Sequence, residues 1–150
     1  MGYSHTSDDE IHAFLWQKGR MTDLGTLGGP ISFAFAINDR GQVLGTSEDA
    51  SRGGHIVIWE KGRIIDIGTI GQEFQEVFAL NNRGQIVGNR FNDSVGDYHA
   101  VIWDRGAIID LGTLGGTFSS AIDINDRGQI VGSALTESGN PQGHATLWER

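Results

Sequence analysis

The sequence predicts an all-β protein made of a repeated structural unit, and three observations support this fold class. Four pentapeptides that begin with His and end with Trp follow one another along the 150 residues, namely HAFLW, HIVIW, HAVIW and HATLW. Glycine is abundant, with 23 residues against 2 prolines, and this composition indicates many turns. No segment shows the spacing of apolar residues that is typical of a helix. Self-similarity at a fixed period is the signature of a repeat architecture.

The period of the repeat is nearly constant when it is measured between the histidines of successive pentapeptides. The steps from His12 to His55, to His99 and to His144 are 43, 44 and 45 residues. Inside each period, seven residues lead from the Trp to an Asp, fifteen from the Asp to an Asn, and seven from the Asn to a Gly. Only the segments between that Gly and the next His vary in length. These variable segments are residues 46–54, 89–98 and 133–143.

Each full period is expected to hold four short antiparallel strands within a single domain. The pentapeptide is the first strand, and a polar turn such as EKGR joins it to a second strand such as RIIDIG. A glycine-rich link such as TLGGPIS leads to the third and fourth strands, which flank INDRGQ or LNNRGQ. Asn and Asp favour turns and Gly supplies a positive φ, so these sequences indicate a hairpin. The predicted units are a partial repeat at 1–11, repeats at 12–54, 55–98 and 99–143, and a partial repeat at 144–150.

Four strands in a period of about 44 residues match the size of a β-propeller blade. Three periods in a chain of this length also fit a β-trefoil, which is the alternative fold. Consecutive antiparallel strands place the glycine-rich links and the variable segments at one end of each unit. We expect any ligand to be bound at this end, on a rim of variable loops. The candidate binding residues there are Asp49, Arg52, Arg90, Asn92, Asp97 and Asn140.

Composition excludes several classes of function. The net charge of −8 disfavours nucleic acids and anionic membranes, because binding to either depends on Lys and Arg. No run of apolar residues is long enough for a membrane span, and the absence of cysteine removes disulfides, thiolate nucleophiles and Cys-ligated metals. The glycine-rich GTLGG is followed by no Lys, so it does not indicate a phosphate-binding loop. We expect neither a cofactor nor a metal.

The residues that recur in every period are expected to be structural. A repeated His is more typical of a hydrogen-bond anchor than of a metal ligand, and the repeated Asp is expected to accept hydrogen bonds from the following turn and to pair with His or Arg. The repeated Trp is expected to be half-buried, and stacking on sugars is the alternative. The structural positions are His12, His55, His99, His144, Trp16, Trp59, Trp103, Trp148, Asp23, Asp66, Asp110, Asn38, Asn81 and Asn125.

Catalysis would need residues that differ between the periods, because a single active site is asymmetric. The sequence offers four such residues, and a pair of carboxylates among them could hydrolyse a glycosidic bond if they lay at a suitable separation. No spacing in the sequence brings them together, so we expect the protein not to be an enzyme. The four residues are His5, Glu73, Glu76 and Asp123.

The ordered motifs resemble a known family. His12-Ala13-Phe14, then DLGTLGG at 23–29, then Ile37-Asn38 with Gly41-Gln42 resemble the HAF family of probable extracellular repeats, found mostly in bacterial proteins. The resemblance covers essentially the whole chain, although the middle copy departs from it with DIGTIGQE. The family carries no established catalytic residues, so the resemblance implies only a secreted or surface β-repeat protein.

The predicted function is therefore that of a non-enzymatic extracellular or cell-surface repeat module for binding or self-assembly. A lectin-like propeller that binds glycans and a glycoside-hydrolase-like enzyme are the alternatives. The polar start MGYSHTSDDE shows no signal peptide, so an exported protein would have lost its signal and a cytosolic one would never have had it. Incomplete terminal repeats would leave strand edges unpaired, which predicts a homo-oligomer or closure within one chain. Glycans and proteins are the expected outside partners.

Overall fold

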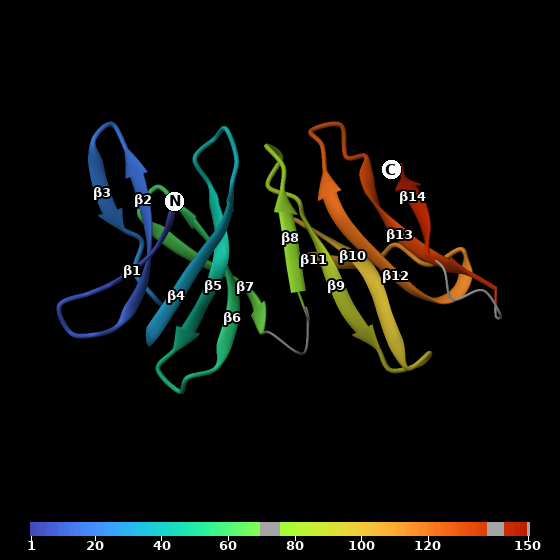
Figure 1. The fold of residues 1–150 in the computed structure, drawn as a ribbon, viewed down its shortest axis with the longest axis horizontal. Helices are drawn as coiled ribbons and strands as arrows, with labels where there is room; N and C mark the ends of the chain where they lie inside the picture. Colours follow the sequence, from blue (N-terminus) through green and yellow to red (C-terminus); the bar gives the residue numbers. More distant parts are fainter. Residues whose placement is uncertain (70–75, 138–142, 150) are drawn as a thin grey trace. The chain divides into compact units, whose positions relative to one another are not determined.

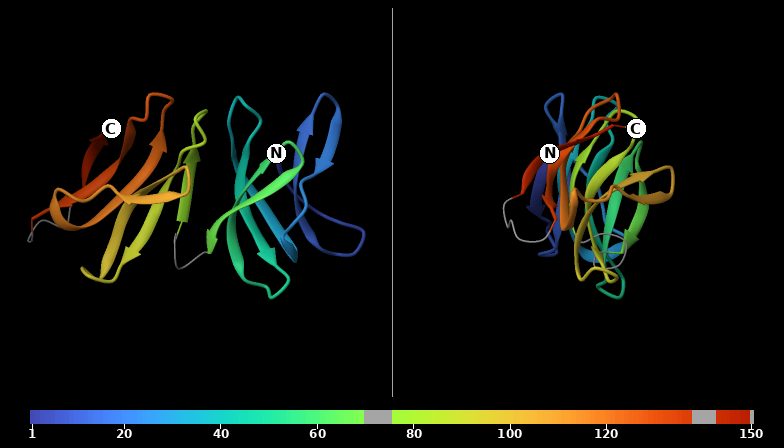
Figure 2. Two further views of the ribbon diagram at one scale, coloured as in Figure 1. Left: turned by 180° about the vertical axis from the view of Figure 1, so that it is seen from behind. Right: turned by 90° about the vertical axis from the view of Figure 1, so that its right-hand side faces the viewer.

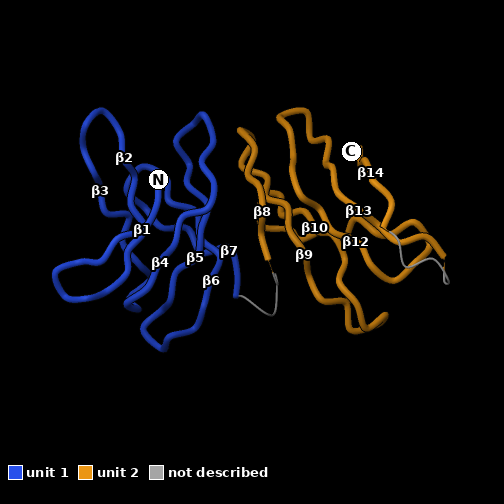
Figure 3. Tube along the Cα trace, viewed as in Figure 1, with its two compact units in different colours: residues 1–70 blue, residues 71–150 orange. Residues whose placement is uncertain are grey.

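The computed structural model describes residues 1–69, 76–137 and 143–149, and it confirms the all-β class (Figure 1). No helix occurs among these residues, so none of them forms a helix that could span a membrane. The chain divides into two compact units, residues 1–70 and 71–150 (Figure 3). We describe each unit by itself.

The strands follow one another along the chain. They are β1 (Gly2–His5), β2 (Ile11–Gln17), β3 (Arg20–Asp23), β4 (Gly28–Ile37), β5 (Val43–Asp49), β6 (Gly54–Glu60), β7 (Arg63–Thr69), β8 (Glu76–Leu80), β9 (Ile86–Asn92), β10 (Asp97–Asp104), β11 (Ala107–Asp110), β12 (Gly115–Ile124), β13 (Ile130–Thr136) and β14 (His144–Trp148).

Most consecutive strands pair antiparallel in both units (Figure 2), although β3 does not pair with β4, nor β11 with β12. In the first unit β4 to β7 form one meander, and β2 pairs with β1 and β3; a single parallel bridge from Ile11 to Ile31 joins β2 to β4. In the second unit β8 to β11 form a four-stranded sheet and β12 to β14 a three-stranded one. Each four-stranded meander begins before an Asn turn and ends after the next Trp, so its strands come from two successive sequence periods.

Alternation along the strands builds an apolar cluster within each unit. In the first unit, Ala13, Val43, Val57 and Trp59 are buried together. In the second unit the cluster is larger, and six buried side chains from β9, β10, β12 and β13 contribute to it. These are Val87, Ala100, Ile102, Ala121, Ile124 and Ile130. Burying a Val or Ile side chain contributes roughly 1.5–3 kcal/mol, so each cluster stabilises its unit.

The repeated Gly of the fourth strand is required by a bulge in the strand beside it. A Cβ on Gly88 would lie 2.1 Å from the carbonyl oxygen of Glu76, and a Cβ on Gly45 would lie 1.9 Å from that of Phe33. The pairing register shifts at this point in each sheet, between Ala34 and Ala36 in β4 and between Val77 and Ala79 in β8. The bulge leaves an extra apolar residue at the surface of the sheet. The extra residues are Phe35, Phe78 and Ile122, all exposed.

Two of the three variable segments, 46–54 and 89–98, are hairpins rather than free loops, and the third lies partly outside the described residues. Pairing continues through Glu48 and Gly54 in the first unit, and through Asn92 and Asp97 in the second. Only residues 50–53 and 93–96 lie between these strands. The glycine-rich link is likewise shorter than expected, because β4 begins inside it at Gly28.

The four repeated Trp side chains differ in burial, which the repeat alone does not predict. Trp59 is 3% exposed and packs against Val43 and Val57, because β6 is flanked by β5 on one side and β7 on the other. Its indole N–H has no hydrogen-bond partner among the described residues. Trp16 is 56% exposed, because β1 pairs with β2 only as far as Phe14. Trp103 and Trp148 are half-buried, as expected.

This difference predicts unequal costs of truncation. Trp59→Ala should lower the free energy of unfolding by about 3–5 kcal/mol, because it removes a buried aromatic ring from the first cluster. Trp16→Ala, the matched control, should change it by no more than about 0.5 kcal/mol, as is usual for exposed positions. Chemical denaturation followed by circular dichroism would measure both. Equal effects of the two substitutions would contradict the burial described for these side chains.

Candidate functional site

Three of the repeated His–Asp pairs are in direct contact. The Nδ1 atom of the imidazole lies 2.8 Å from the carboxylate in the pair His12–Asp23, 2.9 Å in His55–Asp66 and 2.7 Å in His99–Asp110. The histidines are on β2, β6 and β10, and each Asp lies in the strand that follows. Asp23 and Asp110 are the last residues of β3 and β11, and Asp66 lies within β7. The imidazoles are largely buried, with side-chain exposures of 18%, 17% and 11%, whereas the carboxylates are about half exposed.

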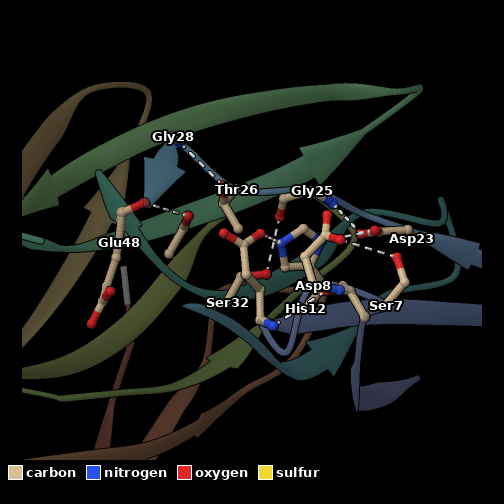
Figure 4. Close-up of polar contacts among 12 residues, drawn as sticks. Ser7, Asp8, His12, Asp23, Gly25, Thr26, Gly28, Ser32 and Glu48 are labelled. Carbon is tan, nitrogen blue, oxygen red and sulfur yellow. Dashed lines mark hydrogen bonds and ion pairs between the residues drawn. The ribbon is translucent and has the colours of Figure 1, made fainter. Parts of the chain in front are cut away.

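Each carboxylate also holds the start of the glycine-rich link. The second oxygen of Asp23 accepts a hydrogen bond from the Gly25 N–H at 2.7 Å (Figure 4), and Asp110 does the same for Gly112 at 2.7 Å. Burial raises the pKa of Asp23, but the hydrogen bonds from His12 and Gly25 lower it more, so the pKa lies below its ordinary value of 3.8. Because an ionised carboxylate only accepts hydrogen bonds, the Nδ1 atom of the paired imidazole must donate.

A serine closes these contacts into a ring of hydrogen bonds, which we call the circuit. Ser32 Oγ donates to the Gly25 carbonyl at 3.0 Å (Figure 4). It also accepts from the N–H of Ala13, the residue after His12, at 3.0 Å. The circuit therefore runs from His12 through Asp23, Gly25 and Ser32 to Ala13. It joins the first strand of a period to the third.

The same circuit exists in the second unit. Ser119 Oγ donates to the Gly112 carbonyl at 2.7 Å and accepts from the Ala100 N–H at 2.9 Å. Both serines are fully buried. In the middle period His55, Asp66 and Gly68 are in place, and the position equivalent to the serine, residue 75, lies outside the described residues.

The repeated Asn is also engaged within the scaffold. Asn38 Oδ1 accepts from the N–H groups of Arg40 and Gln42 at 3.1 and 3.0 Å, and its amide group donates to the Gln42 side chain at 2.6 Å. Asn81 and Asn125 make the same three contacts in their own turns. In the described part of the chain, the repeated Asn, His and Asp residues other than His144 thus serve the fold.

The periods differ at the residue that begins the hairpin turn beside each His–Asp pair. We call this the flanking position, and Thr6, Asp49 and Asn92 occupy it beside the His–Asp pairs of the first, middle and third periods. Each lies two residues after the residue that pairs with the repeated histidine across the hairpin. Each accepts a hydrogen bond from the N–H two residues further on, so the three are structurally equivalent.

In the middle period the flanking residue is turned inward. Asp49 Oδ1 accepts from the Ser51 hydroxyl at 2.7 Å and from the Gly53 N–H at 2.9 Å, and its Oδ2 lies 3.3 Å from His55 Nε2. The hydrogen bonds from Ser51 and Gly53 lower the pKa of Asp49 to about 2. His55 is therefore held between two carboxylates, those of Asp49 and Asp66.

In the third period the flanking residue leaves room beside the pair. A cavity of about 220 Å³ lies next to His99. Asn92 Nδ2 is 3.4 Å from Asp110 Oδ2; its 3.3 Å contact with His99 Nδ1 is not a hydrogen bond, because that nitrogen already donates to Asp110. His99 Nε2 is buried and has no hydrogen-bond partner among the described residues. The cavity is lined by Arg90, Phe91, Asn92, Asp93, Ser94, His99, Val101 and Asp110.

A cavity of about 210 Å³ occupies the equivalent place in the first period, beside His12 and Asp23. Its flanking residue is Thr6, and Phe14 and Met21 also line it. Here Glu10 approaches His12 Nε2 to 3.4 Å. The first and third periods therefore share an open flank, whereas Asp49 lies against the imidazole in the middle one.

The other candidate binding residues divide between internal roles and the surface. Asp97 accepts from the Thr117 hydroxyl at 2.8 Å, so it connects β10 to β12. Arg52 has a positive φ of 66° and lines a cavity of the first unit with the acidic residues Asp8 and Asp9. Arg90 is exposed at the rim of the His99 cavity. Asn140 lies outside the described residues.

The residues considered for catalysis do not meet at this site. Glu76 is the first residue of β8 and is exposed, and Asp123 accepts the N–H of its own neighbour Ile124. His5 lies 3.4 Å from Asp9 at the surface, and Glu73 lies outside the described residues. Within the described ranges, no group of three or more His, Asp or Glu side chains could hold a metal ion.

Sequence reasoning missed the serines of the circuit. Ser32 and Ser119 occur six residues before the repeated Asn in two of the three periods, and this recurrence was the available signal. Comparison with known proteins adds no identification, since no family model, no curated protein and no solved structure matches the chain.

The lowered pKa of Asp49 predicts a measurable dependence of stability on pH. A carboxyl group with a folded-state pKa of about 2 and an ordinary value of 3.8 stabilises the fold above about pH 4, and this stabilisation is lost as the pH falls toward 2. Asp49→Asn keeps an oxygen acceptor but no longer titrates. Its melting temperature should therefore fall less than that of the wild type between pH 4 and 2.

Asp8→Asn, an exposed acidic residue of the same unit, is the control and should retain the wild-type acid response. Thermal melts by circular dichroism at several pH values would measure the effect. If Asp49→Asn loses as much stability in acid as the wild type does, the assigned hydrogen bonds of Asp49 are wrong.

Proposed function

We propose that this protein is a non-enzymatic repeat module of a secreted or cell-surface protein, with propeller-type blades that present hairpin ends to a ligand. The observation that carries the proposal is that the circuit is constant between periods whereas the flanking position beside it varies. The groups that recur are engaged in hydrogen bonds of the scaffold, whereas the flanking position varies and opens a cavity in two of the three periods. Variable side chains on a fixed scaffold are typical of binding proteins.

The four-stranded meander of β8 to β11 supports the blade part of the proposal, since a propeller blade is a four-stranded antiparallel sheet. The resemblance to the HAF repeats supports a location outside the cell. A hydrolase receives less support, because neither Glu76 nor Asp123 lines the cavity beside His99 or the one beside His12. The homo-oligomer stays a prediction of the sequence.

Exchange of a hairpin turn tests the proposal. Replacing residues 93–96 with a Gly-Ser turn of equal length should leave the melting temperature within a few degrees of the wild type, because these residues lie between strands and most are exposed. The replacement should abolish binding to an immobilised array of glycans and bacterial surface polysaccharides. Arg105→Gly, in the turn between β10 and β11, is the control and should retain binding.

Binding that survives the exchange of residues 93–96 would overturn the proposed position of the site. A panel of glycosidase substrates should be tested alongside the array. Turnover of any substrate that disappears in Glu76→Gln or Asp123→Asn would replace the binding module with an enzyme.

A further inference from the structure

We infer that the cavity beside His99 binds one neutral sugar unit through two adjacent hydroxyl groups, with Asp110 as the acceptor and Arg90 and Asn92 as the donors. This inference rests on the proposed function and names the class of ligand. It starts from the three polar side chains that line the same cavity, one from β11 and two from β9.

Asp110 is a carboxylate whose direction is fixed before any ligand arrives. His99 Nδ1 donates to Oδ2 at 2.7 Å and the Gly112 N–H donates to Oδ1 at 2.7 Å, while the side chain remains 45% exposed. A carboxylate has about four acceptor sites, so exposed lone pairs remain for ligand hydroxyls. His99 is a positioning residue in this account, because it acts on the ligand through Asp110.

Arg90 and Asn92 lie on the same side of β9 as the histidine. Arg90 pairs directly with His99 across the hairpin, and side chains two residues apart on a strand share a face. The guanidinium offers several donors in a planar fork, and the amide of Asn92 is weakly engaged, at 3.4 Å from Asp110 Oδ2. Neighbouring hydroxyl groups, each of which donates and accepts, complement one carboxylate beside two donor groups.

The charges and the volume favour a neutral and small ligand. The positive charge of Arg90 is balanced by Asp93 and Asp110 at the same cavity, and the chain carries a net charge of −8, so an anion is disfavoured. A volume of about 220 Å³ is below the roughly 300–1,000 Å³ of pockets for drug-sized molecules, which limits the ligand to a single ring. Phe91, which pairs edge to face with Tyr98, and Val101 are the apolar residues that line the cavity, and its other lining residues are polar or charged. Recognition is therefore mainly polar.

The middle period shows how this site can be closed. Asp49 occupies the position of Asn92 there, and its carboxylate lies against the imidazole of His55. Asn92→Asp should reproduce that arrangement, because it keeps the oxygen that accepts from the Ser94 N–H and removes the amide donor. Substitution of His99 itself is unsuitable as a test, since this buried residue belongs to the circuit.

Titration of the ¹⁵N-labelled protein with methyl glycosides of glucose, galactose and mannose, followed by NMR, tests the inference. At least one glycoside should shift the backbone signals of residues 90–94 and 110–112 with a millimolar Kd. Asn92→Asp and Arg90→Ala should each weaken this binding at least tenfold while retaining the wild-type melting temperature. Arg127→Ala, an exposed arginine in the turn between β12 and β13, removes the same charge and should bind as the wild type does.

Glycine and acetate serve as zwitterionic and anionic probes, and either one binding here in place of the glycosides would overturn the inference. So would glycoside binding that is unchanged in both Asn92→Asp and Arg90→Ala. If no glycoside binds but array binding is still lost on exchange of residues 93–96, the ligand class is wrong and the binding module stands. If neither form of binding occurs, both proposals fail.

Discussion

The hydrogen bond between a buried imidazole and a carboxylate is the interaction on which the rest of this structure depends. It fixes Asp23 at the end of β3 to His12 in β2, and Asp23 also accepts the Gly25 N–H near the start of the glycine-rich link. Burying a polar ring is costly unless its hydrogen bonds are satisfied, so the pair is stable only as a unit. The direction of the link, and with it the place where the next strand begins, follows from this contact.

The circuit explains why the residue types recur at fixed distances. A shift of one residue between His12 and Asp23 would turn one side chain to the other face of its strand, and the pair would separate. Ser32 and Ser119 fix the third strand of their periods in the same way. Each donates a hydrogen bond to a carbonyl of the glycine-rich link and accepts one from an N–H of the first strand. The circuit requires a fixed spacing inside the period, and the hairpin turns can vary because they are not part of it.

The local turns were predictable from the sequence, whereas the strands that lie beside each residue were not. Asn38 and its equivalents close hairpins as expected, since the interactions lie within five residues, and an Asp that accepts from the next turn is a short-range feature too. The burial of Trp59 and the exposure of Trp16 depend on which strands flank them. Both residues occupy the same position of the pentapeptide, so the repeat alone does not distinguish them. The extent of the hairpins around 50–53 and 93–96 was underestimated because polar strand residues resemble loops.

The candidate site was only partly visible for the same reason. Arg90 and Asn92 were expected at a variable rim, and the structure places both at one cavity. That this cavity also contains the repeated His99 and Asp110 could not be read from the sequence, because a repeated pair indicates a scaffold. The difference between an open and a closed flank arises from one residue, Asn92 or Asp49, whose side chain is turned by its own hairpin.

The protonation of the imidazole rings tests this account most directly. Two-bond ¹H–¹⁵N correlation spectra distinguish the two neutral forms of histidine. If the carboxylates hold the rings as described, His12 and His99 carry the proton on Nδ1 in the neutral form, whereas the exposed His5 averages between both forms. A proton on Nε2 of His99, or averaging like that of His5, would contradict the interaction from which the rest of the account is built.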